Sequence, residues 1–338
     1  MSLNATKTNF EESYNVVEII IVVLFSIIFA LGTVGNFFVI FYFGVKLRPA
    51  VPEFLFCALA VVDFFASVFN PLLYVYWTLT RYKWYFGYWA CKFLVPIGTI
   101  ATTMSGGIFV VLSFDRQRTI VYPFKRHFKL VYIKLSIFLI LIYALVMNAH
   151  YALNITLNVE TNKCGVPDTR KKAYLVPSIF YFFINVCTLF VVINFTNYRI
   201  FSKMVNQSPT STLFLGSRAK RRKKDNYRII RLLIALTTVF FFLTVPRDIL
   251  QFVFLMSWSF GKGLSISKSI LTLNSFLKVI NVANSCMNPL IYYWMHFGFK
   301  RFIKRSCGIK SKLLIRGRTS EFNSTKRFSM ASLKNNYG

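Results

Sequence analysis

Seven long, charge-poor stretches constrain the fold of this 338-residue chain more than any other feature of its sequence. About 20 apolar residues in an α-helix cross the ~30 Å hydrocarbon core of a bilayer. If a soluble core buried all of these stretches, almost no polar surface would remain to dissolve the protein. The sequence therefore predicts an all-α membrane protein with seven transmembrane helices. We expect them over Ile19–Val45, Phe54–Thr80, Phe93–Phe114, Leu135–Val159, Ala173–Tyr198, Leu232–Gly261 and Ser269–Phe299.

Most of the 41 lysine and arginine residues lie on one side of this predicted topology. They follow the first, third, fifth and seventh spans, and basic residues favour the cytoplasmic side of a membrane. We therefore expect a multi-pass plasma-membrane protein with an extracellular N-terminus and a cytoplasmic C-terminus. The formal net charge of +30 then reflects this bias and attraction to the anionic inner leaflet, not nucleic-acid binding.

The polar segments divide the chain into three expected parts. These are a short extracellular tail (residues 1–17), a transmembrane domain (18–306) and a cytoplasmic tail (307–338). The tail and the insert 206–228 are basic and rich in serine, so we expect both to be flexible. We find no metal-spaced His/Cys cluster and no nucleophile–base constellation, which argues against an enzyme.

Polar residues interrupt the last apolar stretch, where Asn284, Ser285 and Asn288 precede Pro289 and Tyr292. Polar groups are costly in hydrocarbon, and a proline leaves a backbone carbonyl without its helical hydrogen bond. This pattern is more typical of a functional site than of packing.

A second motif ends the third span, where Asp115-Arg116-Gln117 lies 25 residues after Cys91. At ~1.5 Å per residue, Cys91 and Arg116 are ~37 Å apart and at opposite membrane faces. Arg116 could be only a basic residue at a helix end. The spacing from Cys91 and the following Tyr122-Pro123-Phe124 favour a specific role.

These two motifs, together with Gly35-Asn36 and Trp84-Tyr85-Phe86-Gly87, resemble those of rhodopsin-family (class A) G-protein-coupled receptors. The resemblance covers nearly the whole chain. It implies a seven-transmembrane receptor that binds an extracellular ligand and activates a heterotrimeric G protein.

The resemblance also implies roles for particular residues. Cys91 and Cys164 form a disulfide, and Asp115 holds Arg116 in the resting state. The residues of the coupling and activation path are Asp115, Arg116, Phe240, Pro246, Asn288, Pro289 and Tyr292. Asp63, Ser105, Asn284, Ser285 and Asn288 match positions that surround an allosteric sodium ion, and hard cations prefer such oxygen donors. No other cofactor is expected.

The basic end of the chain carries further signals. Apolar and basic residues alternate over Phe297–Arg305, which suits a short amphipathic eighth helix lying on the inner leaflet. Cys307 follows it as a candidate palmitoylation site. The tail then offers candidate phosphorylation sites for arrestin recruitment, which are Ser320, Ser324, Thr325, Ser329 and Ser332.

The sequence also departs from the family pattern. Leu243-Thr244-Val245-Pro246 replaces the usual Cys-Trp-x-Pro, and Gln117 replaces a tyrosine. The fifth span lacks its central proline. Asn197 replaces an inner tyrosine, unless a shift of one residue supplies Tyr198. These changes leave the expected fold unaffected and the activation step open, including reduced or unusual signalling.

The ligand class follows from the outer half of the spans. Gly98 lacks the carboxylate that amine receptors need, and Val282 lacks the opsin lysine. The loop Leu157–Val166 is compatible with a β-hairpin, which favours a neuropeptide ligand. A small-molecule or chemosensory receptor is the alternative, and a channel or transporter a remote one.

Charged residues near Pro246 predict the pocket itself. Arg247 and Asp248 point ~100° apart on one helix, so we expect them to pair poorly with each other. An Asp248–Lys278 ion pair would leave Arg247 for an anionic ligand group. Gln251, one turn above Arg247, would add a hydrogen bond, and Thr99 and Thr102 would form the opposite wall. Separately, the sequons at Asn4 and Asn154 are candidate extracellular glycosylation sites.

Overall fold

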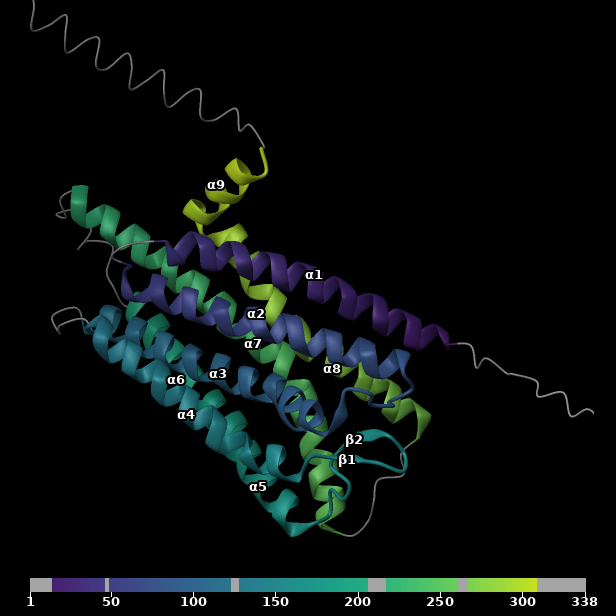
Figure 1. Ribbon diagram of the computed structural model, residues 1–338. Helices are drawn as coiled ribbons and strands as arrows, with labels where there is room; N and C mark the ends of the chain where they lie inside the picture. The colour runs from purple at the N-terminus through teal and green to yellow at the C-terminus, as the bar shows by residue number, and fades with distance from the viewer. Residues whose placement is uncertain (1–13, 46–48, 123–127, 206–216, 261–266, 309–338) are drawn as a thin grey trace, which may run out of the picture.

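The computed structural model describes residues 14–45, 49–122, 128–205, 217–260 and 267–308. These residues form a bundle of long helices with a small hairpin at one end and a short helix at the other (Figure 1). The elements are α1 (Val16–Gly44), α2 (Val51–Leu79), α3 (Gly87–Val121), α4 (Leu130–Asn154), β1 (Thr156–Asn158), β2 (Lys163–Gly165), α5 (Lys172–Phe182), the π-helical turn η1 (Phe183–Cys187), α6 (Thr188–Val205), α7 (Ser217–Ser259), α8 (Lys268–Met295) and α9 (Phe297–Ser306).

Six helical segments of the described chain are long and apolar enough to cross a membrane. They are α1, α2, α3, α4, the continuous segment Lys172–Lys203 and the part of α7 over Tyr227–Ser259. The remaining long helix, α8, has 28 residues but is more polar than these six segments. It packs against α1, α2 and α7, and Asn284, Ser285 and Asn288 are buried in the bundle, so α8 completes a seven-helix arrangement.

Most helix boundaries differ from the sequence prediction by a few residues or more, and α4 and α8 show the reasons. α4 begins five residues before the expected Leu135, because Lys134 can lie at the helix surface with its ammonium 5.9 Å from the Phe54 ring centroid. It ends at Asn154, where the chain enters the hairpin. The last expected span, Ser269–Phe299, breaks at His296 before α9.

The expectation of a flexible insert over 206–228 is wrong for its second half. α7 begins at Ser217, and arginine and lysine, which are abundant over 217–228, are good helix formers. Residues 206–216 and most of the tail after Cys307 lie outside the described residues.

The fifth span is interrupted by the turn η1 in the absence of a central proline. Asn185 within this turn is buried, and its amide nitrogen donates to the Tyr181 carbonyl at 3.0 Å. The Tyr143 hydroxyl of α4 donates to the Asn185 side-chain oxygen at 3.0 Å. Side-chain hydrogen bonds of this kind fix a π-bulge in place, and such bulges recur at functional sites.

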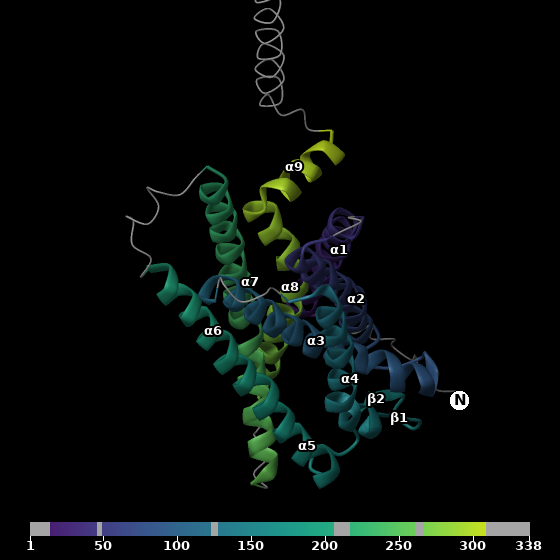
Figure 2. The same ribbon diagram turned by 90° about the vertical axis from the view of Figure 1, so that its left-hand side faces the viewer.

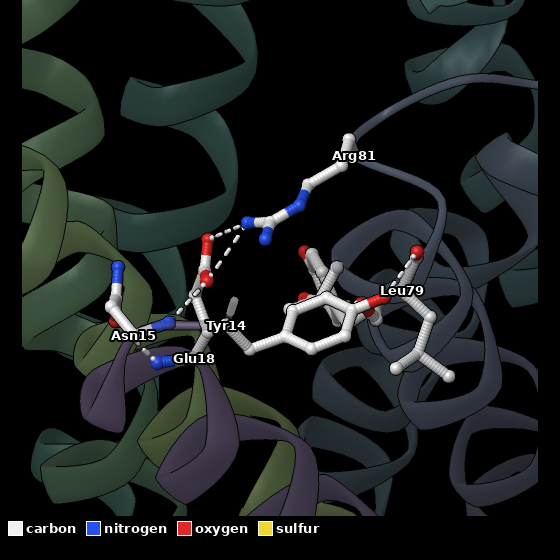
Figure 3. A network of polar contacts seen from close by, with 7 residues as sticks. Tyr14, Asn15, Glu18, Leu79 and Arg81 are labelled. Atoms are coloured by element: carbon white, nitrogen blue, oxygen red, sulfur yellow. Dashed lines mark hydrogen bonds and ion pairs between the residues drawn. The ribbon is translucent and has the colours of Figure 1, made fainter. Parts of the chain in front are cut away.

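A polar network fastens the start of α1 to the loop after α2 (Figure 3). Asn15 and Glu18 form a capping box, which satisfies backbone N–H groups at the helix start. Arg81 Nη1 contacts both Glu18 oxygens at 2.9 Å, and its guanidinium lies 4.4 Å from the Tyr14 ring centroid. The Tyr14 hydroxyl donates to the Leu79 carbonyl at 2.9 Å. The network fixes the start of α1 and the end of α2 relative to each other.

Candidate functional site

The bundle encloses a cavity of about 650 Å³ near the hairpin end. Its lining comes from α2 to α8, including the turn η1. All six residues predicted from the sequence to bind ligand lie along it: Thr99, Thr102, Arg247, Asp248, Gln251 and Lys278. The volume is in the range of pockets that hold a small molecule or part of a peptide.

The β1–β2 hairpin is tied to α3 at the mouth of the bundle. Leu157 pairs with Cys164 in the antiparallel register, and Cys164 is joined to Cys91 by a disulfide with a Cα–Cα distance of 5.7 Å. Cys91 lies in the second turn of α3 and is fully buried. The bond and the strand pairing together hold the hairpin over α3, and the hairpin is in the loop where the sequence predicted one.

The predicted Asp248–Lys278 ion pair is wrong. Within the described residues, Asp248 instead lies 3.8 Å from Arg247 Nη1, because the flexible arginine stem spans the angle between neighbouring helical positions. Lys278 Nζ lies 5.4 Å from the Tyr74 ring centroid, which is a cation–π distance. At 3.8 Å the Arg247–Asp248 contact is an ion pair without a hydrogen bond.

Two cations therefore face the cavity with little neutralisation. In the part of the chain that the structure describes, neither the Arg247 guanidinium nor the Lys278 ammonium donates a hydrogen bond, and Asp248 is the only carboxylate in the cavity lining. A guanidinium offers five donors in a fixed plane, which match a carboxylate or phosphate. The cavity is thus suited to an anionic group.

A polar wall of the cavity, formed by side chains of α3, α4 and α5, was not predicted from the sequence. Thr103 Oγ1 lies 2.9 Å from the Tyr181 hydroxyl and accepts from Asn148 Nδ2 at 3.0 Å, which joins α3, α4 and α5. Thr99 and Thr102, which the sequence did identify, donate to backbone carbonyls of their own helix. Asparagines inside apolar runs, such as Asn148 and Asn185, are the signal that could have revealed this wall.

The predicted sodium-site residues converge in the centre of the bundle. Ser105 Oγ donates to one Asp63 oxygen at 2.9 Å, and Asn288 Nδ2 donates to the other at 2.5 Å. The side-chain oxygens of Asn284 and Asn288 are buried without a hydrogen-bond partner among the described residues. Carboxylate, hydroxyl and unpartnered amide oxygens are the donors that a hard cation takes. Ser285 contributes its backbone carbonyl, which accepts from Asn36 Nδ2 at 2.9 Å.

The residues of the predicted coupling path lie along the inside of the bundle. Arg116 is paired with Asp115, its Nε donating at 2.9 Å, and both residues are buried. Tyr292, which follows Pro289 in α8, is fully buried between Phe43 and Phe56. These contacts are consistent with a resting arrangement in which the arginine is held by its neighbour.

Higher in α7, the Phe240 ring packs against Phe109 of α3 with ring centroids 4.9 Å apart. The hydroxyl of Thr244, one turn above, donates to the Phe240 carbonyl at 2.9 Å. Phe240 and Thr244 before Pro246 and Arg247 after it line the cavity, so the region of α7 around this proline forms part of the cavity wall.

The predicted modification sites lie at the two ends. Asn154 Nδ2 donates to the His150 carbonyl at 2.7 Å and lies 3.4 Å from the Ala173 carbonyl, so its amide is already engaged. Cys307 is exposed directly after α9. Asn4 lies outside the described residues.

The sequence pattern of the 7-transmembrane receptor (rhodopsin family) matches residues 35–292, most of the chain. The protein therefore belongs to the rhodopsin family of seven-transmembrane receptors, which are G-protein-coupled receptors and not enzymes. The predicted fold class and receptor function are confirmed, and a family receptor of this kind is a multi-pass plasma-membrane protein with an extracellular ligand and a G-protein partner.

Several characterised receptors are similar over most of their length. The C3a anaphylatoxin chemotactic receptor of Danio rerio is 28% identical over 90% of this chain and 79% of its own. The C5a anaphylatoxin chemotactic receptor 1 of Oncorhynchus mykiss is 25% identical over 84% and 79%. The type-1 angiotensin II receptor of Homo sapiens is 27% identical over 86% and 80%.

Proposed function

We propose that this receptor binds an extracellular peptide and that an anionic group of the peptide reaches Arg247. The observation that carries the proposal is the pair of cations, Arg247 and Lys278, that face the cavity beneath a disulfide-anchored hairpin. The similar receptors are named for the peptides C3a, C5a and angiotensin II, which supports the same ligand class here.

The roles of individual side chains follow from their places in the cavity. Arg247 would contact the anionic group, while Asp248 and Tyr74 keep Arg247 and Lys278 in position. Gln251 would add a hydrogen bond one turn above Arg247, and Thr99 and Thr102 would form the α3 wall. A ligand carboxylate that accepts from the half-buried Arg247 guanidinium would gain a charge-assisted hydrogen bond.

The test is a screen of peptide and small-molecule libraries on cells that express the receptor with promiscuous G proteins. For a peptide agonist, Arg247→Ala should weaken binding by about 2 kcal/mol, or roughly thirtyfold, at unchanged surface expression. Arg247→Lys keeps the charge and should lose less. A response only to uncharged small molecules, unaffected by Arg247→Ala, would contradict the proposal.

We propose further that a sodium ion binds beside Asp63, with Ser105, Asn284, Ser285 and Asn288 around it. The unpartnered amide oxygens of Asn284 and Asn288 support this assignment. When bound, the ion would supply the positive charge that the buried carboxylate lacks and would favour the inactive bundle. The protein's own contribution is to hold oxygen donors from α2, α3 and α8 at one point.

The remaining proposals concern the two faces of the membrane. The basic end of the bundle, with Arg116, would face the cytoplasm, the G protein and arrestin. Residues 307–338 would follow the transmembrane domain of residues 18–306 as a cytoplasmic tail, most of which lies outside the described residues. Residues 1–17 are then extracellular, with Asn4 as the preferred glycosylation site because the Asn154 amide is hydrogen-bonded. α9 would lie on the inner leaflet, where exposed Cys307 could be palmitoylated.

A further inference from the structure

A gap between α6 and α7 extends the cavity towards the surrounding lipid. The residues that line this extension include Phe190, Asn194 and Asn197 of α6 and Thr237, Thr238, Phe241 and Phe242 of α7. The two helices cross at an angle and do not run closely parallel (Figure 2). Phe242 is 69% exposed, so this side of the gap faces outward from the bundle.

Two contacts bracket the gap. On one side, the Phe190 and Phe241 rings lie 4.7 Å apart between centroids. On the other, Asn197 Nδ2 donates to Thr237 Oγ1 at 3.0 Å. Because α6 and α7 run antiparallel, Asn194 and Thr238 occupy the level between these contacts and lie on opposite sides of the gap.

These two polar side chains are exposed and do not satisfy each other. Within the described residues, no hydrogen bond joins Asn194 to Thr238, and the Thr238 hydroxyl makes none at all. The neighbouring Thr237 and Thr244 instead donate to carbonyls of their own helix. Asn194 Nδ2 donates to the Phe190 carbonyl at 2.8 Å, which leaves its side-chain oxygen as a free acceptor. Exposed, unsatisfied polar groups in a transmembrane span are costly and require a partner.

We propose that this gap, the α6–α7 slot, binds the hydroxyl of a membrane sterol. The slot is lined by neutral side chains, which excludes a charged headgroup as its preferred occupant. One hydroxyl can donate to Asn194 Oδ1 and accept from Thr238 Oγ1, which gives each of these two polar atoms a hydrogen-bond partner. Planar rings of the lipid would then lie along Phe190 and Phe241.

The depth of the slot also fits a sterol. Asn194 lies five residues from Arg199, or about 7.5 Å of helix rise, and Thr238 lies seven from Arg231, or about 10 Å. These arginines lie towards the basic end of the bundle, and long basic side chains extend to the headgroup boundary. The slot therefore lies just beneath that boundary, where a lipid with one hydroxyl and a rigid apolar body can reach it.

The test uses the intact receptor in phosphatidylcholine nanodiscs that contain a photoreactive sterol with a free 3-hydroxyl. After irradiation, mass spectrometry should find adducts in the segments 190–197 and 237–242. Excess unlabelled sterol should compete, and its 3-methyl ether should compete poorly. Thr238→Val and Asn194→Leu should each reduce labelling about fivefold, in keeping with the loss of one hydrogen bond.

Matched variants make the result specific. Thr238→Ser keeps the hydroxyl and should retain labelling. Ser136→Ala removes a hydroxyl from the exposed face of α4 and should change nothing. Labelling of α4 and the slot to the same extent, as expected if only water occupies the slot, would overturn the proposal, as would undiminished labelling of Thr238→Val. The readout needs neither agonist nor G protein, so it stands apart from the proposed peptide function.

Discussion

Asp63 accepts hydrogen bonds at both carboxylate oxygens, yet both donors, Ser105 and Asn288, are neutral. A buried carboxylate is costly without a positive charge nearby. The structure places two further unpartnered oxygens, those of Asn284 and Asn288, in the same region. A cation there would satisfy all of these groups at once.

Agonist affinity should therefore depend on sodium. An ion that binds the inactive bundle more tightly must oppose agonist binding by linkage. We expect agonist affinity to fall when sodium replaces N-methylglucamine at constant ionic strength, measured by competition binding. Asp63→Asn should abolish that dependence while binding itself persists. Binding of the unmutated receptor that ignores sodium would refute the site.

At the scale of an element, the β1–β2 hairpin depends on its single covalent tie to α3. Cys91 and Cys164 are 73 residues apart in sequence, so the disulfide removes much conformational freedom from the unfolded chain between them. Cys91→Ala or Cys164→Ala should lower stability by about 2–4 kcal/mol, seen in thermal unfolding of the purified receptor. Agonist binding should weaken as the hairpin leaves the cavity mouth.

Cys187→Ala is the matched control, because this cysteine is exposed at the end of the turn η1 and forms no disulfide. It should leave unfolding and binding unchanged. Equal losses in Cys187→Ala and Cys164→Ala would show that cysteine replacement as such is harmful, and would remove the disulfide from the explanation.

The apolar spans and their order were predictable because membrane helices satisfy a simple length and polarity requirement. The cavity was also predictable at the level of helix faces, since Arg247, Lys278 and Thr99 all line it. The pairing of the charged groups could not be predicted, because it depends on side-chain conformations. Asp248 contacts Arg247, and the Lys278 ammonium lies over the Tyr74 ring.

The turn η1 was equally hidden from sequence reasoning. Asn185 in this turn donates to the Tyr181 carbonyl and accepts from the Tyr143 hydroxyl of α4, and no local sequence pattern predicts these bonds. The helical start of α7 was missed for the opposite reason. Its basic composition is typical of a solvated loop, although arginine and lysine are also good helix formers.

At the scale of the whole molecule, the cavity and the coupling face are connected through α3 and α7. Phe109 and Phe240 pack against each other between them, and the Phe240 carbonyl accepts from Thr244 beside the cavity. A ligand that moves α7 about Pro246 would therefore disturb this ring contact first. The usual tryptophan is replaced by Thr244, so the buried Phe240 ring, which packs on Phe109, is placed to transmit the movement.

The coupling step at the other end should require Arg116. In the structure this residue is held by Asp115, and both are buried. Release of the guanidinium would expose it to the G protein, so Arg116→Ala should bind agonist normally and lose G-protein activation. Asp115→Asn should instead raise agonist-independent signalling, because the carboxylate that restrains the arginine is gone. Both effects are measured by nucleotide exchange on a reconstituted G protein.

Arg118→Ala serves as the control for Arg116→Ala. Arg118 lies two residues later on the same helix, with its guanidinium 4.6 Å from the Phe128 ring centroid. Its loss removes the same charge from the same region, so general electrostatic attraction to the G protein would weaken equally in both variants. A specific role for Arg116 requires that exchange collapse in Arg116→Ala and largely survive in Arg118→Ala. Similar activity in the two variants would assign coupling to the basic surface as a whole.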